Sequence, residues 1–127
     1  MSIKKQILIV DDEEDIVQSI IRRMISTYSD RYEPHVATDG FEAMDILMKK
    51  DIDLVILDIR MPNMDGTEVA KRVLRDRKLR FTPIVISSGF VNESQKEEFR
   101  KMGIHHFLDK PYHMNDLFEV ISQLLTS

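Results

Sequence analysis

Carboxylate side chains gather directly after two apolar segments of this 127-residue chain. Asp11 and Asp12 follow the run 6–10, and Asp58 follows the run 53–57. Carboxylate oxygens are hard ligands that suit Mg²⁺ or Mn²⁺, and the absence of cysteine excludes a thiolate site for a softer metal. Adjacent carboxylates at a buried strand end repel each other unless a cation offsets the cost. Either a divalent cation or Lys110 could offset this cost.

A hydroxyl and an ammonium group follow two later apolar segments. Ser87 and Ser88 come after the run 83–86, and Lys110 comes just after the run 105–108. Either serine alone could be an ordinary hydrogen-bonded hydroxyl at a strand end. Both serines therefore remain candidates on the residues alone, and Lys110 could balance the acids.

These groups meet only if the segments before them are strands of one parallel sheet. Near-continuous Val, Ile and Leu is what strands covered on both faces require. One segment contains Pro34, which cannot donate a ladder hydrogen bond and therefore suits an edge strand. The expected strands are 6–10, 32–37, 53–57, 83–86 and 105–108.

Helical patterns separate the strands. Apolar stripes at helical spacing cover 17–28 and 117–125, and a third helix begins near Gly66. Asp39 and Asn92 each open a capping-box pattern, and the helix after Asn92 has so few apolar residues that weak docking is expected.

The alternation of strands and helices predicts a single α/β domain over residues 1–127. It is doubly wound, with a parallel five-stranded sheet between two helical layers. Ligands bind such sheets beyond the carboxyl ends of the strands, where the acids, Ser88 and Lys110 would lie. We assign the acids 13–15 to the first turn of the first helix, where negative charge complements the helix dipole.

Four motifs, in this order, resemble the receiver domain of two-component response regulators, close to the single-domain chemotaxis type. The resemblance covers essentially the whole chain and implies a flavodoxin-like (βα)5 three-layer sandwich with strand order 2-1-3-4-5. The motifs are Val10-Asp11-Asp12, Asp58 with Met61-Pro62-x-Met64-Asp65-Gly66, Ser88 thirty residues after Asp58, and Lys110-Pro111 twenty-two residues after Ser88.

The resemblance implies a phosphorylation-dependent signalling switch. Asp58 would accept a phosphoryl group from the phosphohistidine of a sensor histidine kinase or a phosphotransfer protein. Asp12 and Asp58 would bind Mg²⁺ directly, with Mn²⁺ as the other suitable ion, and Asp11 would act through water. The backbone carbonyl of Arg60 would complete the protein ligands.

The resemblance also implies how the switch responds. Ser88 and Lys110 would engage the new charge, and the Lys110–Pro111 peptide bond would be cis. Phe107 occupies the aromatic switch position, although an ordinary core role for this ring stays equally open. The surface of the fourth helix, fifth strand and fifth helix would then change and regulate an output protein.

Other functions remain as alternatives. A receiver-like module that docks without phosphorylation is the first of them. An aspartate-dependent phosphohydrolase would need a second Asp where this chain has Arg60. A flavin carrier would need phosphate donors where the acids 11–15 would repel the phosphate. We expect no enzyme beyond self-catalysed phosphotransfer and slow autodephosphorylation, which the bulk of Arg60 and Phe90 would slow further.

Charge and hydropathy narrow the partners. Eighteen Lys and Arg against 22 Asp and Glu give a formal net charge of −4 and no overall basic footprint, so direct DNA binding is not expected. No apolar run reaches membrane-spanning length, so we expect a cytoplasmic protein without membrane contact. Residues 71–80 carry six basic residues and one acid, which indicates a solvated helix end or, alternatively, a docking surface.

Overall fold

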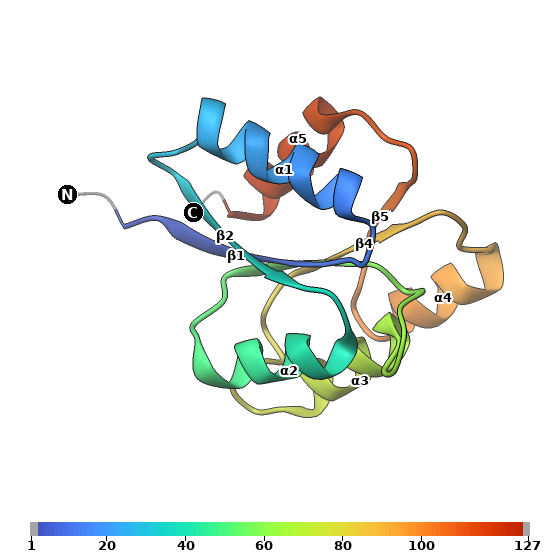
Figure 1. Cartoon of the computed structure of the whole chain (residues 1–127). Coiled ribbons are helices and arrows are strands. Elements are labelled where there is room, and N and C mark those ends of the chain that lie inside the picture. Colours follow the sequence, from blue (N-terminus) through green and yellow to red (C-terminus); the bar gives the residue numbers. More distant parts are fainter. Residues whose placement is uncertain (1–2, 126–127) are drawn as a thin grey trace.

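The computed structural model describes residues 3–125, in which five strands alternate with five helices (Figure 1). The strands are β1 (Lys5–Val10), β2 (Tyr32–Ala37), β3 (Leu54–Leu57), β4 (Ile84–Ser88) and β5 (His106–Asp109). The helices are α1 (Glu14–Thr27), α2 (Gly40–Lys49), α3 (Gly66–Arg75), α4 (Glu93–Lys101) and α5 (Met114–Leu125).

All strand pairs are parallel, and the order is β2-β1-β3-β4-β5. This order and the alternation with helices confirm the predicted doubly wound, flavodoxin-like fold. The strand that contains Pro34 lies at one edge of the sheet, as its missing N–H group predicts. No helix within residues 3–125 is both long enough and apolar enough to cross a bilayer.

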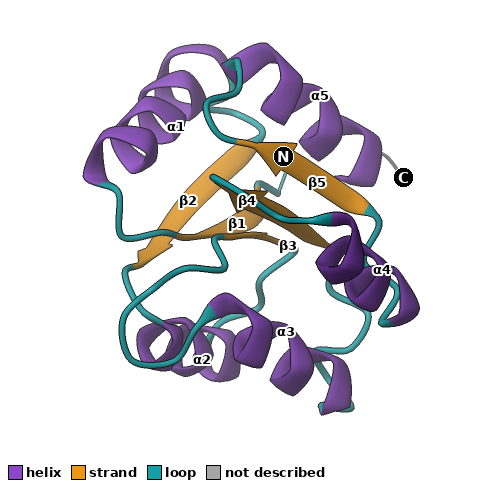
Figure 2. Cartoon of the chain, turned by 90° about the vertical axis from the view of Figure 1, so that its right-hand side faces the viewer, coloured by secondary structure: helices purple, strands orange, loops and turns teal. Residues whose placement is uncertain are grey.

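Successive strand residues point to opposite faces, so each strand feeds two cores. Leu8 and Val10 of β1 belong to the core on the side of α2, α3 and α4, whereas Ile7 and Ile9 belong to the core on the side of α1 and α5. Figures 1 and 2 show these two helical layers on either side of the sheet. The inner strands are therefore apolar over most of their length, and their polar residues lie at strand ends, with Lys5 and Gln6 at the start of β1 and Ser87 and Ser88 at the end of β4.

Helix α4 is attached less firmly than the other helices. Phe99 is the one fully buried residue of the helix, and Met102 at its C-terminal end is half-buried. Its start is well defined, because the capping box between Asn92 and Gln95 forms in both directions. A helix with a firm cap but few buried contacts can shift at low cost.

Three sequence-derived details need adjustment. Strand β4 begins one residue later and ends two residues later than the expected strand 83–86, so Ser87 and Ser88 belong to the strand. The last strand begins at His106 and extends to Asp109, one residue later than expected at each end. At α2, Asp39 accepts the Glu42 N–H group, but the Glu42 carboxylate accepts the N–H group of Thr38. The second hydrogen bond of the capping box therefore involves Thr38, the residue before the N-cap, and not the N–H group of Asp39 itself.

Gly66 fixes the loop after β3 against its own start. Its N–H group donates to the Ile59 carbonyl at 2.8 Å. A Cβ atom here would press on the Asp58 carbonyl and the Ile59 Cα atom, both of which are backbone. Only glycine permits this approach, and it brings the first turn of α3 directly beside Asp58.

We predict that Gly66→Ala lowers the free energy of unfolding by about 2 kcal/mol, because the backbone beside Asp58 must move to admit a methyl group. Urea titration measures the loss. Gly89→Ala is the matched control, since a Cβ atom at Gly89 meets nothing within 4 Å, and its effect should stay within about 0.5 kcal/mol. Equal stability of the two variants would contradict the close-packing argument.

Candidate functional site

Three carboxylates converge at the carboxyl edge of the sheet. Asp11, Asp12 and Asp58 each offer an oxygen within 4.8 Å of the others, an arrangement that could hold a metal ion. Asp11 and Asp58 are 2% and 3% exposed, whereas Asp12 faces solvent. The sequence-derived metal residues thus come together, with one open side toward water.

The sheet ladder itself places the two buried acids. The Asp58 N–H group donates to the Val10 carbonyl at 2.9 Å, and the Asp11 N–H group donates to the Ala37 carbonyl at 3.0 Å. Each acid therefore continues a strand by one residue. Their separation is set by strand spacing and not by a flexible loop.

Lys110 reaches into this cluster from the end of β5. Its Nζ atom lies 2.8 Å from Asp11 Oδ2, 2.9 Å from Glu13 Oε1 and 3.3 Å from Asp58 Oδ2. Its backbone N–H group donates to the Ser88 carbonyl at 2.9 Å, and the Lys110–Pro111 peptide bond is cis. One ammonium group thus contacts three carboxylates.

Burial sets the charge balance of the cluster. Burial raises the pKa of Asp11 and of Asp58 above the usual value, and Lys110 only partly opposes this rise. Burial also lowers the pKa of Lys110, but its hydrogen bonds to Asp11 and Glu13 outweigh that effect and raise it overall. The lysine stays charged while the carboxylates remain incompletely neutralised, so the site favours a further cation.

The two serines at the end of β4 differ sharply. The Ser87 hydroxyl lies 2.8 Å from the Tyr112 hydroxyl and forms a hydrogen bond with it. The Ser88 hydroxyl is buried and has no hydrogen-bond partner within the described chain. A buried hydroxyl without a partner is costly, and a new acceptor nearby would satisfy it. This contrast favours Ser88 over Ser87 as the responsive hydroxyl.

Sequence reasoning missed two contributors. Glu13 was expected to serve the helix terminus, but its side chain makes no cap hydrogen bond and instead pairs with Lys110. Its N–H group donates to Asp11 Oδ1 at 2.8 Å. Tyr112 forms a hydrogen bond with the Ser87 hydroxyl, but it belongs to no periodic pattern or motif in the sequence. Only the spacing of two residues after Lys110 hinted that it faces the same site.

The remaining predicted residues lie around the cluster. The Arg60 N–H group donates to Asp58 Oδ1 at 3.3 Å, and the Arg60 side chain is exposed. Phe107 is half-buried, with its ring centroid 6.2 Å from that of Phe99. The cationic groups of Lys96 and Arg100 lie 5.8 Å and 5.7 Å from the Phe107 ring centroid. This ring therefore belongs to the boundary between β5 and the weakly held α4.

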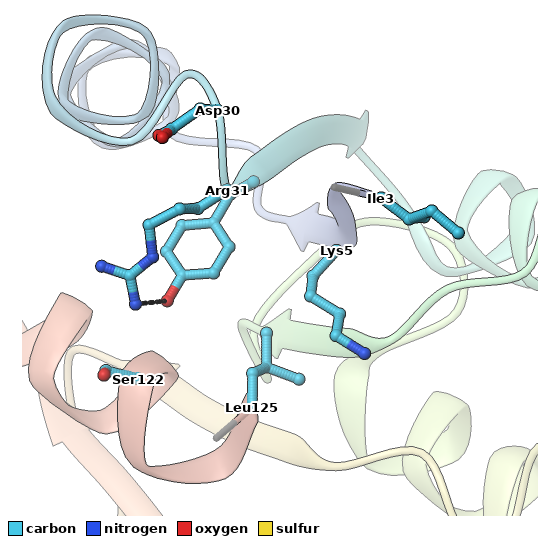
Figure 3. Close-up of a pocket in the computed structure, with 7 residues that line it drawn as sticks. Ile3, Lys5, Asp30, Arg31, Ser122 and Leu125 are labelled. Carbon is cyan, nitrogen blue, oxygen red and sulfur yellow. Dashed lines mark hydrogen bonds between the residues drawn. The ribbon is translucent and has the colours of Figure 1, made fainter. Parts of the chain in front are cut away.

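One hollow lies away from the acids. A cavity of about 360 Å³ lies at the amino ends of β1 and β2 beside α5, on the opposite edge (Figure 3). Its Arg31 guanidinium donates to the Tyr32 hydroxyl at 3.3 Å and also lies over the Tyr28 ring. A smaller hollow of about 250 Å³ adjoins Asp11 and Asp12. Asp11 and Asp12 therefore lie beside the smaller of these two hollows.

Residues 7–122 match the family profile described as the response regulator receiver domain. The chain belongs to this family. Receiver domains are signalling proteins, and their acidic pocket binds Mg²⁺, for which Asp11, Asp12 and Asp58 are the matching cluster here.

Individual receiver proteins support the same assignment. The polar-differentiation response regulator DivK of Brucella ovis is 29% identical over 121 residues, which are 95% of this chain and 96% of that protein. The chemotaxis response regulator CheY4 of Vibrio cholerae has a solved structure with a TM-score of 0.85 and 29% identity, covering 97% of this chain and 100% of that one. The Francisella response regulator 1452 receiver domain has a TM-score of 0.82 at 28% identity, covering 95% and 96%.

We predict that Mg²⁺ stabilises the chain, because the cation relieves repulsion among the three carboxylates. At a concentration 100 times its Kd, the free energy of unfolding should rise by about 2.7 kcal/mol in urea titrations. Asp12→Asn should abolish most of the rise without disturbing the ion pairs of Lys110, in which Asp12 takes no part. Asp30→Asn, an exposed acid at the opposite edge, should keep it. An equal rise in Asp12→Asn would refute the metal assignment.

Proposed function

We propose that this receiver domain accepts a phosphoryl group on Asp58 from the phosphohistidine of a sensor histidine kinase or phosphotransfer protein. The P–N bond of the donor breaks, a P–O bond to a carboxylate oxygen of Asp58 forms, and the donor imidazole leaves and takes up a proton. The modified domain then regulates an output protein. The observation that carries the proposal is the Asp58 carboxylate held 3.3 Å from a buried ammonium group, with an unpartnered hydroxyl at the next strand end.

Asp58 fits the acceptor role chemically. A carboxylate is a nucleophile without a general base once it is ionised, and the acids beside it supply metal ligands. Burial raises its pKa, but the Lys110 ammonium favours the ionised form. The charge of Lys110 also screens the approaching phosphoryl oxygens, since phosphoryl transfer depends mostly on positioning and charge stabilisation.

The metal would be held by Asp12 and Asp58 directly, by Asp11 through water and by the Arg60 carbonyl. Mg²⁺ would supply positive charge that screens the carboxylates from an incoming phosphoryl group. The chain's own part is to keep the ligands apart by strand spacing and to hold the Asp58 carboxylate with the N–H group of Arg60.

The response would begin at Ser88 and Lys110. A phosphoryl oxygen offers Ser88 the acceptor that its buried hydroxyl lacks, and it offers Lys110 a stronger partner than Asp58 alone. The β4 segment that ends in Ser88 leads directly to α4, which has a single fully buried residue. Phe107 lies against this helix, so its packing would shift with α4 and change the surface of α4, β5 and α5.

The alternatives fit the site less well. A module that only docks does not require three carboxylates, a lysine and an unsatisfied hydroxyl at one strand edge. A phosphohydrolase would need a carboxyl group in place of Arg60, whose side chain is exposed and cationic. We retain the docking module as the second candidate because α4 offers a movable surface without any chemistry.

Acetyl phosphate with Mg²⁺ should add one phosphate to the parent chain, measured by intact mass. The adduct should be absent in Asp58→Asn and in parent protein treated with EDTA. Asp53→Asn is a matched control, because this acid lies at the other end of the same strand and should leave the adduct intact. An adduct that persists in Asp58→Asn would disprove the assignment of the acceptor.

The phosphoryl group should be lost faster in the double variant Arg60→Ala, Phe90→Ala. Both side chains are exposed next to strand ends at the site, with Phe90 60% exposed, and their bulk would obstruct the hydrolytic water. We expect loss on the order of tenfold faster, followed by mass spectrometry over time.

The control for this lifetime is Arg80→Ala, Phe81→Ala, which removes the same two residue types from a solvent-exposed pair elsewhere. Its phosphoryl lifetime should equal that of the parent. If the Arg60 and Phe90 variant also equals the parent, bulk at these positions does not govern water access.

A further inference from the structure

A third hollow lies between α3 and the end of α4. Its volume is about 320 Å³, and Lys71, Leu74, Arg75 and Met102 line it. Both helices begin at the carboxyl edge of the sheet and run back from it, so their C-terminal ends lie away from the acids. The hollow is thus separate from the proposed phosphorylation site, and it shares only the C-terminal end of α4 with the surface of α4, β5 and α5.

The lining of this hollow combines two apolar and two cationic side chains. Leu74 and Met102 are half-buried and form an apolar floor, and Lys71 and Arg75 are exposed and one helical turn apart. Half-buried apolar side chains in a hollow still contact water, so a side chain placed against them would remove apolar surface from solvent. The rim is therefore charged, and the floor favours an apolar ligand group.

The rim cations are not neutralised by the chain itself. Arg72 pairs with Glu68 at 3.1 Å and Lys78 pairs with Asp51 at 3.4 Å, but neither of these lines the hollow. Within residues 3–125, no ion pair involves Lys71 or Arg75.

The acid nearest in sequence does not serve the rim. The Asp76 carboxylate accepts the N–H groups of Lys78 and Leu79 at 2.8 Å and 3.1 Å, so the turn uses it. Complementation of the C-terminal helix dipole accounts for cations in the last turn of α3, such as Arg72 and Arg75. It accounts neither for Lys71 nor for an apolar floor between the cations.

We propose that this hollow docks an acidic segment of a partner protein, with one large apolar side chain on Leu74 and Met102 and flanking carboxylates on Lys71 and Arg75. The combination of an apolar anchor and opposite charges at the rim is typical of peptide recognition. A nucleic acid would contact the cations of the run 71–80 but would leave the apolar floor uncovered, and a lipid surface would need a broader apolar patch. The docking does not depend on phosphorylation of Asp58, so it stands or falls apart from the proposed function.

A displayed library of random 12-residue peptides tests the proposal. Selection on the parent chain should enrich peptides with several Asp or Glu residues around one Leu, Phe or Met. In solution, these peptides should bind Lys71→Glu, Arg75→Glu at least about tenfold more weakly than the parent. Arg22→Glu, Lys50→Glu makes the same charge change at exposed sites outside the hollow and should bind like the parent.

Further measurements separate docking from general charge attraction. Leu74→Ala should also weaken binding, because the floor and not only the rim contacts the peptide. Far-ultraviolet circular dichroism and Mg²⁺-dependent stability should be unchanged in the charge variant, which shows that it folds. The proposal is overturned if no acidic motif is enriched, if both charge variants bind equally, or if only oligonucleotides or phosphatidylserine vesicles bind through Lys71 and Arg75.

Discussion

The functional edge of this structure depends on one ammonium group, that of Lys110, which lies among buried carboxylates. Lys110 contacts Asp11 more closely than Asp58, at 2.8 Å against 3.3 Å, and also contacts Glu13. Burial raises the pKa of both aspartates despite this lysine, so Lys110 does not fully compensate the negative charge of the cluster. The site is stable enough to fold but gains from each added positive charge. This uncompensated negative charge is the physical basis for a cation at the carboxyl edge of the sheet.

The fold holds this uncompensated charge in place because Asp11, Asp58 and Lys110 each directly follow the last residue of a strand. Asp11 and Asp58 donate backbone hydrogen bonds to the neighbouring strands, and Lys110 donates one to Ser88. Gly66 lets the next helix start against the Asp58 carbonyl. Sheet hydrogen bonds therefore fix the backbone positions of these charged residues, and the neighbouring helix α4 is held by a single fully buried residue. When charged groups are held rigidly beside a loosely held helix, a change of charge at the site can shift that helix.

Much of this arrangement could be predicted from the sequence. Continuous apolar runs mark the inner strands, Pro34 marks an edge, and parallel strands necessarily bring Asp11, Asp58 and Lys110 to one end. The partnership of Glu13 could not be predicted, because an acid before a helix fits a cap equally well, and only the reach of Lys110 decides between them. Side-chain direction likewise distinguishes Ser88 from Ser87, since adjacent strand residues face opposite layers and only one meets Tyr112.

The distribution of charge, rather than its sum, separates the two surfaces of the molecule. The net charge of −4 combines an acidic cluster at the start of α1 with a basic run over residues 71–80. Helix α4 connects the two regions, because it follows the strand that ends in Ser88 and ends at Met102 in the basic hollow. Its single fully buried residue, Phe99, contacts the Phe107 ring between these ends. The ring contact between Phe99 and Phe107 is therefore the place where a movement of α4 would be met by repacking, whichever end of the helix it began at.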